Sequence, residues 1–568
     1  MLGIGQTDAM LEAMPVRQKF ILLGIVLFAA VLFFTGIDWG LPSRESDPFL
    51  FGNRTPWTGQ QIMQLAGAWE TEAARGADVA MHPLRGRDEP VVLNDTDAKR
   101  AEIVRRYRLY SNQPDEMITF RSLSRMKPGR LDFDPGMYQY GGLWIYPVGA
   151  LLKLASMVHL VTLRTDLAFY LDHPGAFARF YLVARWYSAA WGILGVIVVL
   201  ALGRELSGSF VVGAAAAGIY AAMPVVIDLA HEAKPHLAGT VLTLMTVLAG
   251  VRYVRTGDRK WWVLAGIFAG ASVGMVLSGY AAFAVLPVMT MLRPIAWKRR
   301  FQITGGATLI GIAVFAVTNP YLPFNLLFHR EVLKSNVGNS VAFYPPGLSI
   351  DGLAVAWRLL MEGTSIAPLI AGLIGAIVLS LRKKRIGVLP AAVAALVLIQ
   401  FILLAGGKTA EYARFALTLD VILAICGAWL IDCLSITSRE KVWAALLLVV
   451  STLFFGLRYD INFVADHRPD STRMEAAGNL AKSGEYTVAV WVEPAPYCMP
   501  AVNLFDRRIV LEPQGTDVSK LESGSVGVRA VDDPRLVNRL SPKRVLSPIS
   551  WANKPIEILS GHGGTENK

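Results

Sequence analysis

The sequence has few charged residues for its length and very few cysteines. Only 17% of its 568 residues are Asp, Glu, Lys or Arg, whereas 53% are hydrophobic, and the mean hydropathy is +0.42. This composition excludes an ordinary soluble enzyme and is typical of a polytopic membrane protein. Of the three cysteines, Cys426 and Cys433 lie in or beside an apolar run and Cys498 lies in a distant polar tail. Neither a disulfide framework nor a zinc site is therefore predicted.

The sequence also lacks a Walker motif, a GxGxxG motif after a predicted strand, and a signal-peptide cleavage pattern in residues 1–19. The first apolar segment, residues 20–37, is instead predicted to be a retained membrane anchor. The formal net charge is +11. In a membrane protein the position of Lys and Arg beside short loops matters more than their total, so nucleic acid is not an expected partner.

The positions of the basic residues predict the topology. Arg17 and Lys19 precede the first span and place the N-terminus in the cytoplasm. Residues 137–158 could span the membrane or lie along its surface as a juxtamembrane helix. Only the second arrangement leaves Arg204 and every later basic cluster on the cytoplasmic side. We therefore expect residues 137–158 to lie at the membrane surface.

The predicted fold is a polytopic α-helical membrane protein with about eleven transmembrane helices and a small C-terminal α/β extracytoplasmic domain. The transmembrane part covers residues 1–457 and includes a large first extracytoplasmic loop with juxtamembrane helices, residues 38–178. The tail, residues 458–568, has a helix-like stretch followed by strand-like runs. The expected spans are 20–37, 180–203, 208–227, 237–253, 261–279, 281–296, 303–319, 364–381, 386–405, 414–431 and 442–457.

The unusual polar residues gather on the predicted outer side. Three acids follow the first span, the second outer loop reads DLAHEAKPH, and GKTAEYARF precedes the tenth span. A transporter would carry such residues near mid-bilayer on broken helices. An enzyme that uses a lipid-phosphate-linked donor needs a carboxylate to accept a proton, fixed cations for the phosphate leaving group, and an apolar groove for the lipid. The pattern favours this second class.

In its order of segments the chain resembles the GT-C glycosyltransferases, which include the dolichyl-phosphate-mannose protein mannosyltransferases and the aminoarabinose lipid A transferases. Members often carry a Gly-Leu-Pro…Asp-Glu stretch after the first span. Here Gly40-Leu41-Pro42 and Asp47 match, but Pro48 stands where the second acid is common. The further similar segments are Tyr138–Pro147, Gly203–Leu206, Lys234–His236 (where many members have Pro-Asp) and Tyr412–Arg414.

The resemblance implies transfer of a sugar from a polyprenyl-phosphate donor by single displacement with inversion, on the extracytoplasmic side of a bacterial inner membrane. It implies Asp47 as the base, with Glu45 as a substitute. The residues expected to bind substrate are Lys234, His231, His236, Lys408, Tyr412, Arg414, Tyr138 and Tyr140. The expected partners are the donor, membrane lipid, and an acceptor that could be a protein, a lipid or a glycan.

Each of these residues also has a purely structural interpretation. Asp47 could cap a short helix, because Ser46 and Asp47 precede Pro48. Lys234 could extend to the membrane surface, and the tyrosines could belong to an interfacial belt. The sequence leaves open whether the protein binds a divalent metal ion, whose candidate ligands are Glu232 and His236. A transporter or flippase of a lipid-linked or small solute is the alternative function, and a non-catalytic scaffold is a third.

Overall fold

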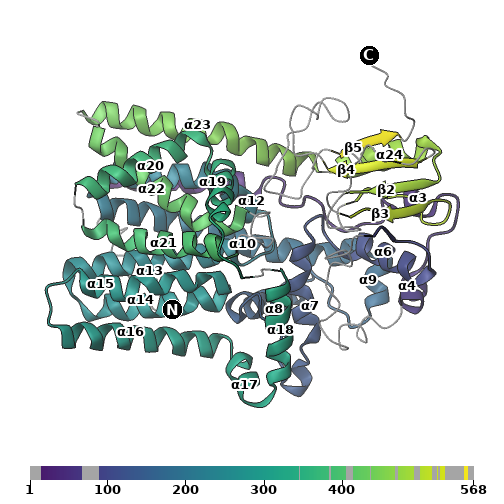
Figure 1. Ribbon diagram of the computed structural model, residues 1–568, viewed down its shortest axis with the longest axis horizontal. Helices are drawn as coiled ribbons and strands as arrows, with labels where there is room; N and C mark the ends of the chain where they lie inside the picture. The colour runs from purple at the N-terminus through teal and green to yellow at the C-terminus, as the bar shows by residue number, and fades with distance from the viewer. Residues whose placement is uncertain are drawn as a thin grey trace.

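The computed structural model describes residues 15–66, 89–343, 346–382, 385–404, 413–434, 437–466, 471–491, 499–513, 521, 525–530 and 556–560. Long helices form a bundle on one side, and shorter helices and a β-sheet form the other side (Figure 1). The chain is a helical polytopic membrane protein.

Seven helical segments in the described part of the chain are long and apolar enough to cross a membrane, or up to nine if each of two bent pairs is one span. The bent pairs are α11 (Phe210–Ala222) with α12 (Pro224–Ala230), at 60°, and α19 (Asp351–Thr364) with α20 (Ile366–Leu381), at 118°. The seven are α2 (Val16–Phe34), α10 (Pro174–Ser207), α13 (His236–Thr256), α16 (Trp297–Thr318), η4 with α21 (Arg385–Gly387 and Val388–Leu404), α22 (Leu417–Leu434) and α23 (Ser438–Ala465).

This number is smaller than the eleven spans expected from the sequence. The difference lies mainly in residues 261–296, which were expected to form two regular spans. Here α14 (Arg259–Met275) ends before Val276, which is extended, and the chain continues as the 3-10 helix η3 (Leu277–Ala284) and the short α15 (Val285–Met291). Hydropathy alone does not reveal such a break, because the residues around Val276 are almost all apolar or small.

The large first loop consists of short elements. The expected surface helix is α8 (Gly142–Met157), whose 16 residues are fewer than the roughly 20 that a span needs. Two helices, α17 (Tyr321–Phe328) and α18 (Arg330–Phe343), belong to a later loop, between α16 and α19. The other elements of the first loop are α3 (Asp47–Phe51), α4 (Gly59–Ala66), β1 (Val91–Val92), α6 (Asp97–Leu109), η1 (Pro114–Glu116), α7 (Met117–Arg125), η2 (Pro128–Arg130) and α9 (Leu167–Asp172).

The tail contains α24 (Thr472–Ser483) and four strands of a five-stranded mixed sheet, whose strand order is β1-β3-β2-β4-β5. The first loop contributes β1, which pairs antiparallel with β3. Apolar residues of the first loop and the tail also share one buried cluster, so the two regions pack as one unit beside the bundle. The tail strands are β2 (Thr487–Val490), β3 (Arg508–Leu511), β4 (Ser525–Ala530) and β5 (Ile556–Ser560).

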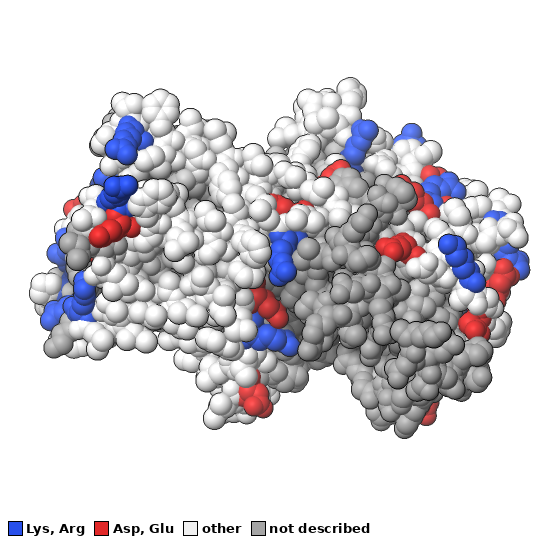
Figure 2. Space-filling model, turned by 90° about the horizontal axis from the view of Figure 1, so that it is seen from above, with Lys and Arg blue, Asp and Glu red and all other residues white. Residues whose placement is uncertain are grey.

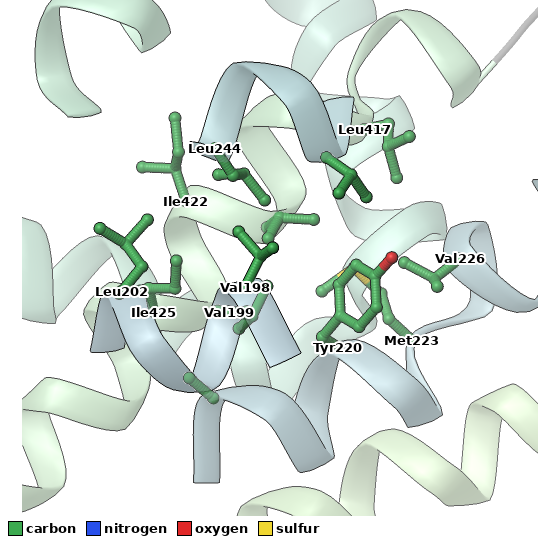
Figure 3. Packing of buried hydrophobic residues seen from close by; sticks show 14 of the residues in the cluster. Val198, Val199, Leu202, Tyr220, Met223, Val226, Leu244, Leu417, Ile422 and Ile425 are labelled. Atoms are coloured by element: carbon green, nitrogen blue, oxygen red, sulfur yellow. The ribbon is translucent and has the colours of Figure 1, made fainter. Parts of the chain in front are cut away.

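A second buried cluster holds the bundle together. Val198, Val199 and Leu202 of α10 face Tyr220 of α11 and Ile422 of α22 (Figure 3). On the molecular surface, Lys and Arg gather at the end of the bundle that is farthest from the sheet, and a largely uncharged band separates them from the charges of the loop–tail unit (Figure 2). The sidedness that the basic residues predict stays a prediction.

Candidate active site

An ion-pair cluster forms where the first loop meets the second outer loop and the start of α22. Asp115, on η1, lies 2.9 Å from Nη1 of Arg414 and 3.7 Å from Nζ of Lys234. Lys234 also lies 3.1 Å from Glu232. The Lys234 side chain is 1% exposed and Asp115 is 27% exposed, so the cluster is buried on one side and open on the other at its carboxylate.

The turn that presents Asp115 is fixed by its neighbours in the sequence. Pro114 occupies the first position of η1, and Gln113 caps it by accepting a hydrogen bond from the Asp115 backbone N–H. The Gln113 side chain then donates to Glu232 at 2.8 Å. The next residue, Glu116, is fully buried and accepts bonds from the Ala233 N–H and the Ser111 hydroxyl. These bonds hold the two outer loops against each other.

Glu116 also forms a buried ion pair with Arg185 of α10. The guanidinium donates to both carboxylate oxygens, at 2.9 and 2.8 Å, and neither side chain is exposed. The Nη1 atom of Arg185 donates to the backbone carbonyls of Ile37 and Trp39, just after α2. A charge inside an apolar helix is costly unless it is paired. The Glu116–Arg185 pair therefore ties the first loop to two membrane helices.

A polar pocket lies directly beside this cluster. It is a narrow cavity of about 20 Å³, enough for about one water molecule, and lies among α13, η3, α21 and the turn before α22. His236, the first residue of α13, and Arg414 both line it. The ring of Tyr140 packs edge-on against His236 at 5.9 Å, and its hydroxyl donates to the Asp115 carbonyl at 3.5 Å. The structure thus brings together four predicted substrate-binding residues: Lys234, His236, Arg414 and Tyr140.

Asp47 lies elsewhere. It begins α3, is 4% exposed, and its carboxylate accepts hydrogen bonds from Arg108 at 3.2 and 2.8 Å and from Arg44 at 2.9 Å. Burial lowers the pKa of Arg108, and the bond with Asp47 opposes that shift. Glu45 is exposed and lines a separate cleft together with Arg473 of the tail. The catalytic roles of Asp47 and Glu45 stay predictions, and their surroundings favour the structural interpretation of Asp47.

Two further predicted residues lie in protein networks of their own. The Tyr138 hydroxyl donates to Asp134 at 2.7 Å and accepts from Asn325, and burial raises its pKa, so it stays a neutral donor. His231 stacks on Phe463 at 4.1 Å, and burial lowers the pKa of His231 to about 4. Their roles in binding substrate stay predictions. Lys408 and Tyr412 fall outside the described residues.

The residues proposed as metal ligands do not fit such a site. Both carboxylate oxygens of Glu232 already face hydrogen-bond donors, one from Gln113 and one from the cationic Lys234. A neighbouring cation disfavours a second positive charge. Within the described ranges, no group of three or more His, Cys, Asp and Glu residues is placed to hold a metal ion.

Sequence reasoning overlooked Asp115, Glu116 and Arg185. A signal was present in the sequence, because Asp115 and Glu116 are two adjacent acids, the type of pair that the resemblance led us to seek at positions 47 and 48. Arg185 was a second signal, since an arginine within a predicted span calls for a buried acid.

Residues 179–324 match the profile of the family described as dolichyl-phosphate-mannose-protein mannosyltransferase. The similarity to this family is therefore carried by residues 179–324 of the chain. The matched residues include Arg185, the loop with Glu232 and Lys234, and the break after α14. No curated protein sequence matches the chain.

Several solved structures are similar in fold at low identity. ArnT from Cupriavidus metallidurans in the apo state is 12% identical, with a TM-score of 0.43 over 81% of this chain and 96% of that one. The same protein bound to undecaprenyl phosphate is 14% identical, with a TM-score of 0.40 over 88% of this chain and 97% of that one. The Archaeoglobus fulgidus oligosaccharyltransferase complex with Zn and sulfate is 14% identical, with a TM-score of 0.37 over 77% of this chain. This chain spans 62% of the length of that archaeal protein.

Proposed function

We propose that this GT-C enzyme transfers a sugar from a polyprenyl-phosphate donor to an acceptor hydroxyl at the extracytoplasmic membrane surface. The observation that carries the proposal is the meeting of Asp115, Lys234 and Arg414 beside a polar pocket in the membrane bundle. One carboxylate and two cations are the groups that this chemistry requires. The family assignment of residues 179–324 favours this function over a transporter or flippase.

An apolar cavity provides room for the lipid. It measures about 680 Å³, and its lining from α19, α20, α21 and α22 consists mainly of Leu, Ala, Ile and Trp side chains. Both α21 and α22 also line the polar pocket. A polyprenyl chain in the apolar cavity and its phosphate near Arg414 would therefore lie along the same pair of helices. ArnT, which is similar in fold, has been solved with undecaprenyl phosphate, and this chain would take a lipid of that class.

In the proposed reaction the acceptor oxygen attacks the anomeric carbon and forms the new glycosidic bond. The bond between that carbon and the phosphate oxygen breaks, and its electron pair leaves with the polyprenyl phosphate. Asp115 takes the proton of the acceptor hydroxyl, and Lys234 and Arg414 stabilise the charge on the phosphate. A single displacement inverts the anomeric configuration. Asp47 stays the alternative base, and separate substitutions distinguish the two.

The cations that would hold the phosphate now contact Asp115. An incoming phosphate group would compete with that carboxylate for Arg414 and Lys234, because Asp115 lies within 4 Å of the charged atoms of both cations. Donor binding would thus loosen the ion pairs of Asp115 and leave the carboxylate able to accept a proton.

The test is turnover of purified full-length protein with a panel of undecaprenyl-phosphate sugars, in vesicles that contain extracted native glycans, lipids and membrane proteins as acceptors. We expect release of undecaprenyl phosphate from at least one donor together with labelling of one acceptor fraction, both with and without EDTA. Binding of these lipids without any release would contradict the proposal and favour a carrier.

A further inference from the structure

The chain bends by 118° between α19 and α20, within a stretch that is apolar enough for one membrane span. In Figure 1, α19 runs across the bundle whereas α20 runs along it. Ser365 is the residue at the bend, and it is buried with φ 71° and ψ 160°. Residues other than glycine rarely adopt this conformation, which costs about 1–3 kcal/mol and persists only where the surrounding structure imposes it. The strain at Ser365 therefore calls for an explanation.

A buried hydrogen bond holds this bend against α22. The hydroxyl of Thr364 donates to Oδ1 of Asp420 at 3.0 Å, and both residues are fully buried. The same hydroxyl lies 2.6 Å from the carbonyl oxygen of Leu360, one turn earlier in α19. The neighbouring Gly363 permits this close approach, because a Cβ atom at that position would lie 2.9 Å from Oδ2 of Asp420. The end of α19 is thus fixed to one side chain of α22.

The position of Asp420 alone does not explain its presence. It lies in the first turn of α22, where an acid stabilises the helix dipole by about 0.3–1 kcal/mol. A carboxyl group buried in a membrane span is costly, however, and Oδ2 of Asp420 makes no hydrogen bond among the described residues. An exposed acid would serve the dipole at lower cost. Asp420 is therefore expected to have a role that depends on its contact with Thr364.

The bond between Thr364 and Asp420 lies next to the wall of the apolar cavity. Leu360 of α19 lines this cavity, as do Leu419 and Ile422 of α22, which stand on either side of Asp420 in the sequence. Asp420 itself is not part of the described lining. The angle at the bend therefore determines where the lining residues of α19 lie relative to those of α22.

The other end of α19 is also fixed. The backbone N–H groups of Gly347 and Ser349, just before α19, donate to the carbonyls of Leu403 and Ile402 near the end of α21, at 2.8 and 2.9 Å. Between its two ends, α19 packs against α21, α22 and the turn η6 that carries Arg414. The helix is thus held across the cavity by α21 at its start and by α22 at its end.

We propose that Asp420 is a positioning residue for the lipid substrate. Through Thr364 it fixes the bend at Ser365, and α19 then closes the apolar cavity around the polyprenyl chain. This inference rests on the function proposed above, which places the chain in that cavity and the phosphate near Arg414 and Lys234. Asp420 acts on the affinity for a long chain, and the two cations act on the phosphate.

The experiment compares binding of undecaprenyl phosphate and of geranyl phosphate, which has the same head group on a ten-carbon chain. The purified full-length protein is placed in nanodiscs, and each affinity is expressed as the mole fraction of the lipid in the bilayer. The wild-type protein should bind undecaprenyl phosphate more tightly. Asp420→Leu and Thr364→Val should each weaken binding of undecaprenyl phosphate about tenfold and that of geranyl phosphate much less, because the loss of a buried hydrogen bond frees α19.

Two further variants serve as controls. Asp420→Asn keeps the shape of the side chain and an oxygen that accepts from Thr364, so it should retain the wild-type preference for the long chain. Thr246→Val removes a buried hydroxyl that bonds the carbonyl four residues earlier, as that of Thr364 does, but Thr246 is on α13, outside the described lining of the cavity. This variant should leave both affinities unchanged.

Hydrogen exchange separates a loosened α19 from a general folding defect. Asp420→Leu and Thr364→Val should speed exchange in α19 and leave exchange in α13 unchanged. Equal losses of affinity for the two lipids, or unchanged exchange in α19, would overturn the positioning role. A loss in Asp420→Asn as large as in Asp420→Leu would also overturn it and assign Asp420 to the helix dipole. Failure of the wild-type protein to bind undecaprenyl phosphate would instead overturn the proposed function.

Discussion

Arg414 and Asp115 are 299 residues apart in the chain, yet Nη1 of Arg414 lies 2.9 Å from Oδ2 of Asp115. The contact joins the short turn η6 (Ala413–Phe415) before α22 to η1 of the first loop. It places the carboxylate of the loop against Arg414, which also lines the polar pocket. Chemistry at this carboxylate would therefore occur where the bundle meets the loop–tail unit.

Asp115→Asn should abolish sugar transfer while leaving the fold intact. The amide keeps the shape of the side chain but cannot accept the acceptor proton, and general-base catalysis contributes about 10²- to 10⁴-fold. We expect a loss in that range in the rate of undecaprenyl phosphate release, with an unchanged thermal unfolding midpoint. Asp115 is partly exposed, Lys234 keeps its ion pair with Glu232, and the amide oxygen can still accept a hydrogen bond from Arg414. Full activity in this variant would rule out Asp115 as the base and make Asp47 the preferred candidate.

Asp47→Asn should act mainly on stability. Arg108 is fully buried, and its guanidinium would lose the carboxylate that neutralises it. Removing one partner of a buried ion pair costs about 3–5 kcal/mol. Thermal unfolding of the purified protein in detergent measures this loss. Arg44→Ala is the control, because Arg44 is 44% exposed and contacts the same carboxylate from the surface, where an ion pair contributes about 0–1 kcal/mol. An Asp47→Asn variant of normal stability without transfer activity would identify Asp47 as catalytic.

Much of the architecture follows from patterns that the sequence displays. Long apolar runs predict α2, α10, α13 and α16, and the basic residues beside short loops order them. The grouping of Lys234, His236 and Arg414 could also be predicted, because loops on one side of a membrane converge on one surface. These features depend on periodicity and charge, which are local or statistical properties of the chain.

The rest depends on contacts between distant segments. Val276 is extended because it pairs with Tyr140, and no property of the apolar run 261–296 indicates that pairing. Asp47 and Asp115 are both acids beside a proline in the same loop. Only their partners distinguish them, two arginines for the first and the cations of two other loops for the second.

Asn94→Asp should weaken the packing of the first loop against the tail. The buried Asn94 amide donates to the carbonyls of Leu504 and Arg507 at 2.9 and 2.7 Å, and its oxygen accepts from the Ile509 N–H. The isosteric carboxylate would place a negative oxygen against two carbonyls. We expect a loss of about 1–3 kcal/mol. Faster hydrogen exchange at Arg508–Leu511, with unchanged exchange in α13, would show that the effect is confined to the sheet. Unchanged exchange in β3 would contradict this role of Asn94.

Substitutions at Lys234 and Glu232 distinguish a role of Lys234 in neutralising Glu232 from a role in binding phosphate. Lys234→Met leaves the buried Glu232 carboxylate with Gln113 but without its cation, so the variant should be less stable and should bind undecaprenyl phosphate weakly. Adding Glu232→Gln removes the uncompensated charge. The double variant should therefore recover most of the unfolding midpoint, with a coupling free energy of about 0.5–3 kcal/mol, without recovering lipid affinity. If the double variant regains both properties, Lys234 serves only to neutralise Glu232, and Arg414 would have to hold the phosphate without it.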